Sequence, residues 1–262
     1  MTEQRIPVAV VGLGAIGTVL VSALAQSERY RLAAVAGRDT KKTRARLDEL
    51  GLSAVAVVSA REVSDHAELI FDAAPAEAFR TFAEPTIRAG KELVVISVGA
   101  LLENWDLVEL AKTTGAVIHA PSGAMSGLDG VQAAAQGEIY SAKIVTRKPA
   151  AGLALDDDAP LTEARRLYAG TVRDAFARFP ANVNVAVALS LAGIGPDRTE
   201  IEVWADSSLT RNRHEVRVES DSGVIEIAVE GVPSENPKTG KITAQSILAW
   251  LAKRNSHLRI GT

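Results

Sequence analysis

The sequence predicts two domains: an α/β domain over residues 1–120, built on a doubly wound parallel sheet, and an α+β domain over residues 121–240, built on an antiparallel sheet. Three observations predict this. An apolar strand enters a glycine-rich turn and a helix close to the start of the chain, and short strands then alternate with helices as far as residue 120. Beyond residue 200 the strands instead show period-two alternation, which is typical of an antiparallel sheet with one buried face.

The first strand leads directly into the glycine-rich turn. Residues 8–11 read Val-Ala-Val-Val, and Gly12, Gly14 and Gly17 follow with the spacing G-x-G-x-x-G. The first glycine permits a tight turn, the second lets the backbone approach a pyrophosphate, and the third lets the helix pack closely on the strand. The next helix directs its free amides toward that phosphate, so we expect a Rossmann-type dinucleotide site. A plain βα turn is the alternative. The expected cofactor contacts are Gly12, Gly14, Ala15, Ile16 and Gly17.

The end of the second strand is where such domains select between NAD and NADP. An acidic residue there binds the ribose hydroxyls of NAD, whereas an arginine accommodates the additional phosphate of NADP. Residues 30–36 form the predicted strand, and Gly37 and Arg38 follow it. The sequence therefore favours NADP, or the use of both cofactors, with Arg38 as the selecting residue. Because Asp39 is adjacent, a solvated loop cation is the alternative role of Arg38.

The rest of the first domain continues the alternation of strands and helices. Helices are predicted over residues 40–50 and 103–114 and, after a loop that ends at Pro75, as far as residue 89; strands are predicted over 54–58, 69–73, 93–96 and 116–120. Right-handed crossovers bring the loops that follow the strands to one edge of a parallel sheet. We therefore expect these segments to converge on one crevice: 12–17, Arg38, 73–75, 97–100 and 121–124.

The second domain begins where this rhythm stops. Helices are predicted after the glycine-rich segment 122–127 and over 161–169, 171–179 and 182–191, and strands over 139–147, 200–205, 213–219 and 224–230. Ser222 and Gly223 predict a tight hairpin turn between the last two strands. A final helix over 241–254 is expected to return and pack on the first domain.

Composition excludes several classes of function. The net charge of −3 and a pI near 5.9 argue against nucleic acid or an anionic membrane as the main partner. The chain has no cysteine, so disulfides and cysteine chemistry are impossible, and no His or carboxylate spacing predicts a metal site. No signal peptide is recognisable and no apolar run is long enough to span a bilayer. We expect a soluble cytoplasmic protein.

Among the four histidines, His214 is the strongest candidate for catalysis. It begins a strand after the polar turn 207–213, in the half of the chain that must supply the substrate site, and an ordinary pKa near 6.5 would let it exchange protons near neutrality. His66 lies in a polar connection, His257 lies in a charged C-terminal tail, and His119 ends a strand. Those three fit ordinary surface or strand-end positions.

Two polar side chains near helix starts are further candidates. Asn182 suits a helix N-cap, which leaves Asn184 in the first turn without a structural need to be polar. Lys238, in the segment Asn-Pro-Lys-Thr-Gly before the last helix, could hold a substrate carboxylate or could simply be exposed.

Taken together, these segments resemble the L-aspartate dehydrogenase family over nearly the whole chain. The matching segments are 12–17, 97–100, 122–124, 146–149 (Thr-Arg-Lys-Pro), 179–186 with its Asn-x-Asn, 212–214 (Asn-Arg-His) and 236–239. The resemblance implies NAD(P)-linked oxidation of aspartate to iminosuccinate, which hydrolyses to oxaloacetate and ammonia, and the reverse amination. It also implies His214 as the catalytic histidine, Ala124 and Asn184 as cofactor contacts, and a homodimer formed through the second domain.

The sequence departs from the family pattern at two places near the expected substrate site. Ser207 stands where the family commonly has proline before the histidine, and Ser222-Gly223 replaces a common Phe-Gly pair. The reaction type is therefore better supported than the exact dicarboxylic substrate. Two rival functions are also compatible with the sequence: a related NAD(P)-dependent dehydrogenase or imine reductase acting on another small acid, as in homoserine-dehydrogenase-like enzymes, and a non-catalytic NAD(P) sensor.

Overall fold

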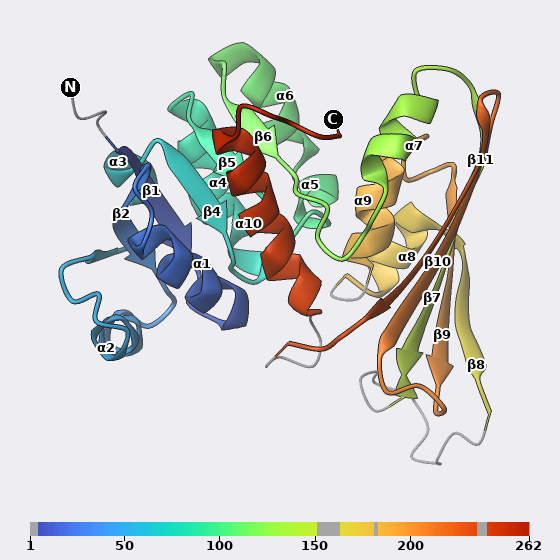
Figure 1. The fold of residues 1–262 in the computed structure, drawn as a ribbon, viewed down its shortest axis with the longest axis horizontal. Coiled ribbons are helices and arrows are strands. Elements are labelled where there is room, and N and C mark those ends of the chain that lie inside the picture. Colours follow the sequence, from blue (N-terminus) through green and yellow to red (C-terminus); the bar gives the residue numbers. More distant parts are fainter. Residues whose placement is uncertain (1–4, 151–162, 181–182, 235–239, 262) are drawn as a thin grey trace. The chain divides into compact units, whose positions relative to one another are not determined.

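The computed structural model describes residues 5–150, 163–180, 183–234 and 240–261. The chain forms two compact units, residues 1–121 and 122–262 (Figure 1). Each unit has its own sheet and its own core. Within the described residues, no helix is long and apolar enough to cross a membrane.

A six-stranded parallel sheet forms the centre of the first unit, with the strand order β3-β2-β1-β4-β5-β6. The strands are β1 (Ile6–Val11), β2 (Tyr30–Ala36), β3 (Ala56–Val58), β4 (Leu69–Asp72), β5 (Glu92–Val94) and β6 (Val117–His119). The order reverses between β1 and β4, because the chain first builds outward through β2 and β3 and then restarts on the other side of β1. Ligands of open α/β sheets bind at the carboxyl ends of the strands beside such a switch point. The predicted Rossmann-type architecture is confirmed.

Helices cover both faces of this sheet (Figure 1). They are α1 (Ala15–Ala25), α2 (Thr40–Glu49), α3 (Val63–His66), a short 3₁₀ turn η1 (Ala76–Ala78), α4 (Phe79–Arg88), α5 (Ala100–Glu103) and α6 (Trp105–Thr114). Because both faces are covered, the central strands are apolar on both sides, and residues 8–11 and 69–72 are completely or nearly completely buried.

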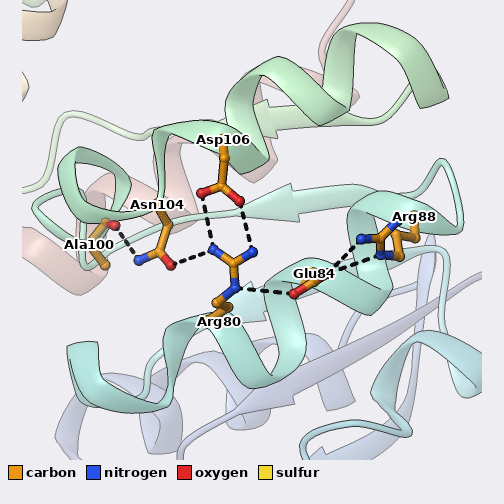
Figure 2. Close-up of polar contacts among 6 residues, drawn as sticks. All are labelled: Arg80, Glu84, Arg88, Ala100, Asn104 and Asp106. Carbon is orange, nitrogen blue, oxygen red and sulfur yellow. Dashed lines mark hydrogen bonds and ion pairs between the residues drawn. The ribbon is translucent and has the colours of Figure 1, made fainter.

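A polar network joins α4 to the segment of α5 and α6 (Figure 2). Arg80 donates to both carboxylate oxygens of Asp106, at 3.0 and 2.8 Å, and to Glu84 at 3.1 Å. Asn104 accepts a further bond from Arg80 at 3.3 Å and donates to the carbonyl of Ala100 at 2.8 Å. The guanidinium holds the pKa of Asp106 below its ordinary value. The network thereby links α4 to the C-terminal end of α5, the helix that follows the loop leaving β5.

The second unit is built on a five-stranded sheet with the order β11-β10-β7-β9-β8. Its strands are β7 (Ile139–Pro149), β8 (Arg165–Thr171), β9 (Thr199–Asp206), β10 (Asn212–Ser220) and β11 (Gly223–Gly231), and its helices are α7 (Leu128–Ala134), α8 (Val172–Arg178), α9 (Asn184–Ala192) and α10 (Lys241–Asn255). Three of the four strand pairs are antiparallel, but β7 and β9 run parallel, so the sheet is mixed. Helices α7, α8 and α9 cover one face (Figure 1).

Alternation along the strands separates a buried face from an outer face, as predicted. Ile201, Val203 and Ala205 of β9 are buried, and Val216 and Val218 of β10 share that face. The hairpin between β10 and β11 closes at Ser220 and Gly223, which pair with each other. Gly223 has φ = +141°, a conformation that favours glycine.

One predicted helix is wrong. The segment predicted as a helix over 161–169 instead contains the edge strand β8, which pairs antiparallel with β9 from Arg165 to Thr171. Leucine, alanine and arginine favour helix locally, but pairing with an adjacent strand supplies hydrogen bonds and packing that a weak propensity does not outweigh. Packing of the C-terminal helix on the first domain stays a prediction.

Candidate functional site

The three glycines of the first turn occupy three different environments. At Gly12, where φ is +98°, a Cβ atom would lie 2.3 Å from the carbonyl oxygen of Ala73. At Gly17, a Cβ would lie 1.9 Å from the carbonyl oxygen of Gly12, so the backbone of α1 packs directly against the backbone of the turn. At Gly14 a Cβ would meet nothing within 4 Å. Two glycines are therefore required by packing, and the middle one borders open space.

The open space at Gly14 lies at the start of α1. Gly14 is the N-cap, no side chain caps this helix, and its first turn carries no acidic residue. The first-turn amides, which include those of Ala15, Ile16 and Gly17, have no acceptor within the helix. A helix start of this kind favours a phosphate through its amides and its dipole. These residues fit the pyrophosphate of a dinucleotide.

The end of β2 carries the expected cofactor-selecting arginine. Asp39 is the N-cap of α2, and its carboxylate accepts hydrogen bonds from the amides of Lys41 and Lys42 at 3.0 and 3.1 Å. Its carboxylate thus has a structural role, whereas the Arg38 side chain is exposed. At Gly37 a Cβ would lie 2.1 Å from the Thr43 hydroxyl, so the position that carries an acid in many NAD-binding domains is restricted to glycine here.

A buried carboxylate, which the sequence analysis did not single out, organises two neighbouring loops. Asp72 is completely buried at the end of β4, beside Val11 of β1. One oxygen accepts from the amide of Ala74 at 3.0 Å, and the other accepts from the amides of Ser97 at 3.0 Å and Ile96 at 3.3 Å. Burial raises its pKa to about 6, although these hydrogen bonds oppose the shift. An acidic residue at the end of an apolar strand was the sequence signal.

In the second unit, His214 of β10 lies opposite Thr146 of β7. The imidazole Nδ1 and the threonine Oγ1 are 3.1 Å apart, and both side chains are buried on the helix-covered face. Within the described part of the chain, the structure gives Nε2 no hydrogen-bond partner. The threonine therefore fixes one end of the ring and leaves the other available to a ligand or water.

The charge state of His214 differs from the one expected from the sequence. Burial, assisted by the positive charge of Lys148, lowers its pKa to about 4. An ordinary value near 6.5 was therefore the wrong expectation for the protein without ligand. The ring is neutral at pH 7, in the form that accepts a proton.

Lys148 is a second buried ionisable residue that was not among the candidates chosen from the sequence. It lies two residues beyond Thr146 on β7 and hence on the same face, with 8% of its surface exposed. Burial lowers its pKa to about 8. The predicted strand ended at residue 147, whereas β7 continues to Pro149, and Lys148 lies within the Thr-Arg-Lys-Pro segment that resembles the family.

The structure describes fewer contacts for the other residues predicted from the sequence to bind the cofactor or the substrate. Asn184 is the first residue of α9 and is half-buried, and Val183 precedes it as the N-cap. Ala124 is half-buried in the segment before α7, which is tied to α10 by a bond from the Gly123 amide to the Ser246 hydroxyl at 3.1 Å. Lys238 and Asn182 lie outside the described residues. The roles of Ala124, Asn184 and Lys238 stay predictions.

Other ionisable groups of the described segments do not form a metal site. No cluster of three or more His, Asp or Glu side chains there could hold a metal ion. His119 contacts Glu92 of the adjacent strand at 2.7 Å, as a strand-end histidine with a partner. The two arrangements that remain are a glycine turn with an uncapped helix start in the first unit and a neutral histidine near a buried lysine in the second.

Comparison with known proteins finds matches over both units. Residues 12–121 match the family model described as the NAD-binding domain of homoserine dehydrogenase, and residues 129–254 match the C-terminal domain of aspartate dehydrogenase. The chain is 46% identical over its full length to an L-aspartate dehydrogenase of Bradyrhizobium diazoefficiens, of which the match covers 98%. This chain belongs to the L-aspartate dehydrogenase family. L-aspartate dehydrogenase 3 of Bordetella bronchiseptica is likewise 46% identical, with 100% of this chain and 99% of that protein covered.

A solved structure shows the same fold. The crystal structure of aspartate dehydrogenase from Thermotoga maritima superposes with a TM-score of 0.79 at 24% identity and covers 98% of this chain and 100% of that one. The fold class predicted for both domains and the family suggested by the motifs are confirmed.

Proposed function

We propose that this protein is an NAD(P)-dependent L-aspartate dehydrogenase, an oxidoreductase that oxidises aspartate to iminosuccinate and catalyses the reverse amination. The observation that carries the proposal is the 46% identity to L-aspartate dehydrogenases over the full chain. A related dehydrogenase acting on another small acid is the nearest alternative, and a non-catalytic NAD(P) sensor is the more distant one.

The first unit supplies the cofactor site. The cofactor is NAD or NADP, whose nicotinamide, when bound, accepts a hydride from the substrate carbon that carries the amino group. The residues proposed to hold the pyrophosphate are Gly12, Gly14, Ala15, Ile16 and Gly17, on the evidence of the open helix start. Ala124 and Asn184 are proposed as further contacts.

His214 is proposed to move the protons. When Nδ1 carries the hydrogen and donates it to the Thr146 hydroxyl, the Nε2 lone pair can accept a proton from water as that water attacks the imine carbon. The resulting imidazolium returns that proton to the nitrogen. The nitrogen then leaves as ammonia, while the new hydroxyl group gives its proton to Nε2 and the carbon–oxygen double bond of oxaloacetate forms. The carboxylates of bound aspartate favour the imidazolium, so substrate binding raises the pKa of His214 from about 4.

The experiment that tests this function is a turnover assay on the full-length protein. Reduced cofactor is monitored with aspartate, glutamate, alanine and homoserine as substrates, and its consumption is monitored with oxaloacetate and ammonia. We expect turnover to be greatest with aspartate. Greater turnover with another acid would support the related dehydrogenase, and cofactor binding without any turnover would support the sensor.

Three finer features belong to the same proposal. Arg38 is proposed to bind the additional phosphate of NADP, because it is exposed at the end of β2 while Asp39 is engaged by α2.

A homodimer is proposed, since two-fold pairs are the commonest oligomers. The proposed interface is the outer face of the second sheet, where the Arg147 guanidinium lies 4.6 Å from the centre of the Trp204 ring. A light-scattering mass of one chain would contradict the dimer. A cytoplasmic location stays a prediction.

A further inference from the structure

We propose that Asp72 is a positioning residue for the cofactor: its buried carboxylate holds the two loops that receive the nicotinamide half of the dinucleotide. The inference rests on the proposed function, because it assigns a role within the cofactor site of that dehydrogenase.

The strand order decides which half of the cofactor Asp72 serves. A dinucleotide lies across the switch point of such a sheet, with one nucleoside over each half. Arg38, the residue proposed to bind the phosphate on the adenosine ribose, follows β2, so the adenosine belongs to the half formed by β1, β2 and β3. The nicotinamide nucleoside then belongs to the half formed by β4, β5 and β6. Asp72 is the last residue of β4, the strand that begins this half.

The carboxylate of Asp72 joins the loops that leave β4 and β5. One oxygen accepts from the amide of Ala74 at 3.0 Å and so closes the turn after β4. The other oxygen accepts from the amides of Ile96 and Ser97, at 3.3 and 3.0 Å, after β5. The Ser97 hydroxyl donates to the carbonyl of Ala74 at 3.2 Å, which is a second link between the same two loops. Removal of the carboxylate therefore leaves three amides without their acceptor.

The loop after β4 borders the glycine turn that is proposed to bind the pyrophosphate. The amide of Ala73 donates to the carbonyl of Val11 at 2.8 Å, and a Cβ at Gly12 would lie 2.3 Å from the carbonyl oxygen of Ala73. The turn also has an anchor on its other side, because the Gly12 amide donates to the carbonyl of Ala36 at 2.7 Å. Loss of the Asp72 contacts should therefore disturb the nicotinamide half more than the pyrophosphate turn.

The burial of Asp72 contrasts with the exposure of the residues that it holds. Its side chain is completely buried, whereas Ala74 and Ser97 are half-buried and so reach the surface at the carboxyl ends of the strands. Burial raises the pKa of Asp72 to about 6, so placing a carboxylate here has a cost that an apolar side chain would avoid. Only a carboxylate offers an acceptor oxygen on both sides, one for each loop. Buried ionisable groups with shifted pKa values concentrate at functional sites.

The test compares Asp72→Ala with the native protein and with the control variant Thr86→Ala. Thr86 is a buried residue of α4 whose hydroxyl donates to the carbonyl of Phe82 at 2.7 Å, so its loss affects stability without removing a contact of either loop. The measurements are Tm and the Kd values of two ligands. The first is the reduced cofactor that the native protein binds more tightly, NADPH or NADH. The second is the matching fragment without nicotinamide, 2′-phospho-ADP-ribose or ADP-ribose.

We expect Asp72→Ala to raise the Kd of the cofactor about tenfold or more and the Kd of the fragment less than about threefold. Thr86→Ala should leave both Kd values close to native even if its Tm falls. Asp72→Asn keeps one acceptor oxygen and places an NH₂ group beside an amide that also donates, so it should raise the cofactor Kd less than alanine does. The asparagine variant carries the test if Asp72→Ala does not fold.

Equal rises in the two Kd values in a folded Asp72 variant would reduce the residue to a structural role. An unchanged cofactor Kd, or no binding of either cofactor to the native protein, would also overturn the proposal. None of these measurements requires aspartate. If the native protein does not turn over aspartate, the proposed function fails, whereas the ratio of the two Kd values still decides the role of Asp72.

Discussion

The imidazole Nδ1 of His214 lies 3.1 Å from the hydroxyl of Thr146, and both residues are buried at directly paired positions of neighbouring strands. The backbone pairing of β7 with β10 sets the distance between their Cα atoms, so the ring is positioned by the sheet rather than by a loop. Catalytic groups held by rigid elements keep their geometry better than groups on loops. The contact orients the ring of His214, and the role proposed for it as a base depends on that orientation.

The pH response of His214 follows from its burial. Since its pKa is about 4 in the folded chain and near 6.5 when unfolded, folding favours the neutral ring, and this contribution to stability is lost as the pH falls from about 6.5 toward 4. NMR titration of the histidine ring signals should show no midpoint near 6.5 for His214. In Lys148→Met the midpoint should rise but stay below 6.5, because burial is the larger cause. A midpoint near 6.5 in the native protein would contradict this account.

Arg38 is predicted to distinguish the two cofactors. Arg38→Ala should weaken NADPH by about 1.5–3 kcal/mol, the range for hydrogen bonds to charged groups, and leave NADH nearly unchanged. The measurement is the Kd of each reduced cofactor by fluorescence titration, with Arg31→Ala, at an exposed arginine of β2, as the control. Equal losses for NADH and NADPH would show that Arg38 does not contact the phosphate.

Alanine at Gly12 should lower the stability of the protein, whereas alanine at Gly14 should weaken cofactor binding. Gly12→Ala places a side chain at positive φ and against backbone, so it should destabilise the first unit by at least about 1–3 kcal/mol. Gly14→Ala meets no atom, so stability should change by less than about 0.5 kcal/mol, while cofactor Kd rises about tenfold. Urea unfolding and cofactor titration on both variants check this. Unchanged cofactor binding in Gly14→Ala would place the pyrophosphate elsewhere.

Asp72 should give the first unit a distinct pH dependence. Its pKa is raised to about 6 by burial from an ordinary value of 3.8, so the folded state retains a proton that the unfolded chain has already lost. Stability from this group is therefore present below about pH 4 and lost as the pH rises through 6, by roughly 2–3 kcal/mol.

The comparison with Asp72→Asn isolates this group, because the variant does not titrate. The free energy of unfolding of the native protein minus that of the variant should be greater at pH 4 than at pH 7, as measured by urea unfolding. A difference that is constant, or greater at pH 7, would show that the buried carboxyl group stays ionised throughout.

The sequence predicted the fold where the physical signal was local. The glycine spacing at Gly12, Gly14 and Gly17 reflects contacts within one turn, and the alternation of Ile201, Val203 and Ala205 reflects one buried face. Both features depend on near neighbours in the chain. Strand β8 was missed because its pairing with β9 joins residues distant in sequence, and the parallel pair β7 and β9 depends on a crossover that local patterns do not specify.

The candidate site, too, was only partly predictable from local sequence. His214 could be chosen from its residue type, its position and the family resemblance, but its neighbours could not. Thr146 and Lys148 lie on another strand, and Thr146 is 68 residues away from His214 in the sequence. Only the register of β7 against β10 brings these two residues close to the histidine. The low pKa of His214 depends on that burial and on Lys148, so an unperturbed value was the only estimate available from sequence.

The most direct measurement is the turnover of His214→Asn and His214→Ala with aspartate, together with the Kd of NADPH and Tm for the same preparations. A positioned general base contributes about 10²–10⁴-fold, so kcat should fall by that range. The Kd should stay near the native value, because the residues proposed to bind the cofactor in the glycine turn are unchanged. A folded His214→Ala protein with nearly native kcat would contradict the account, and a loss of Tm and cofactor binding in parallel with kcat would reduce His214 to a packing residue.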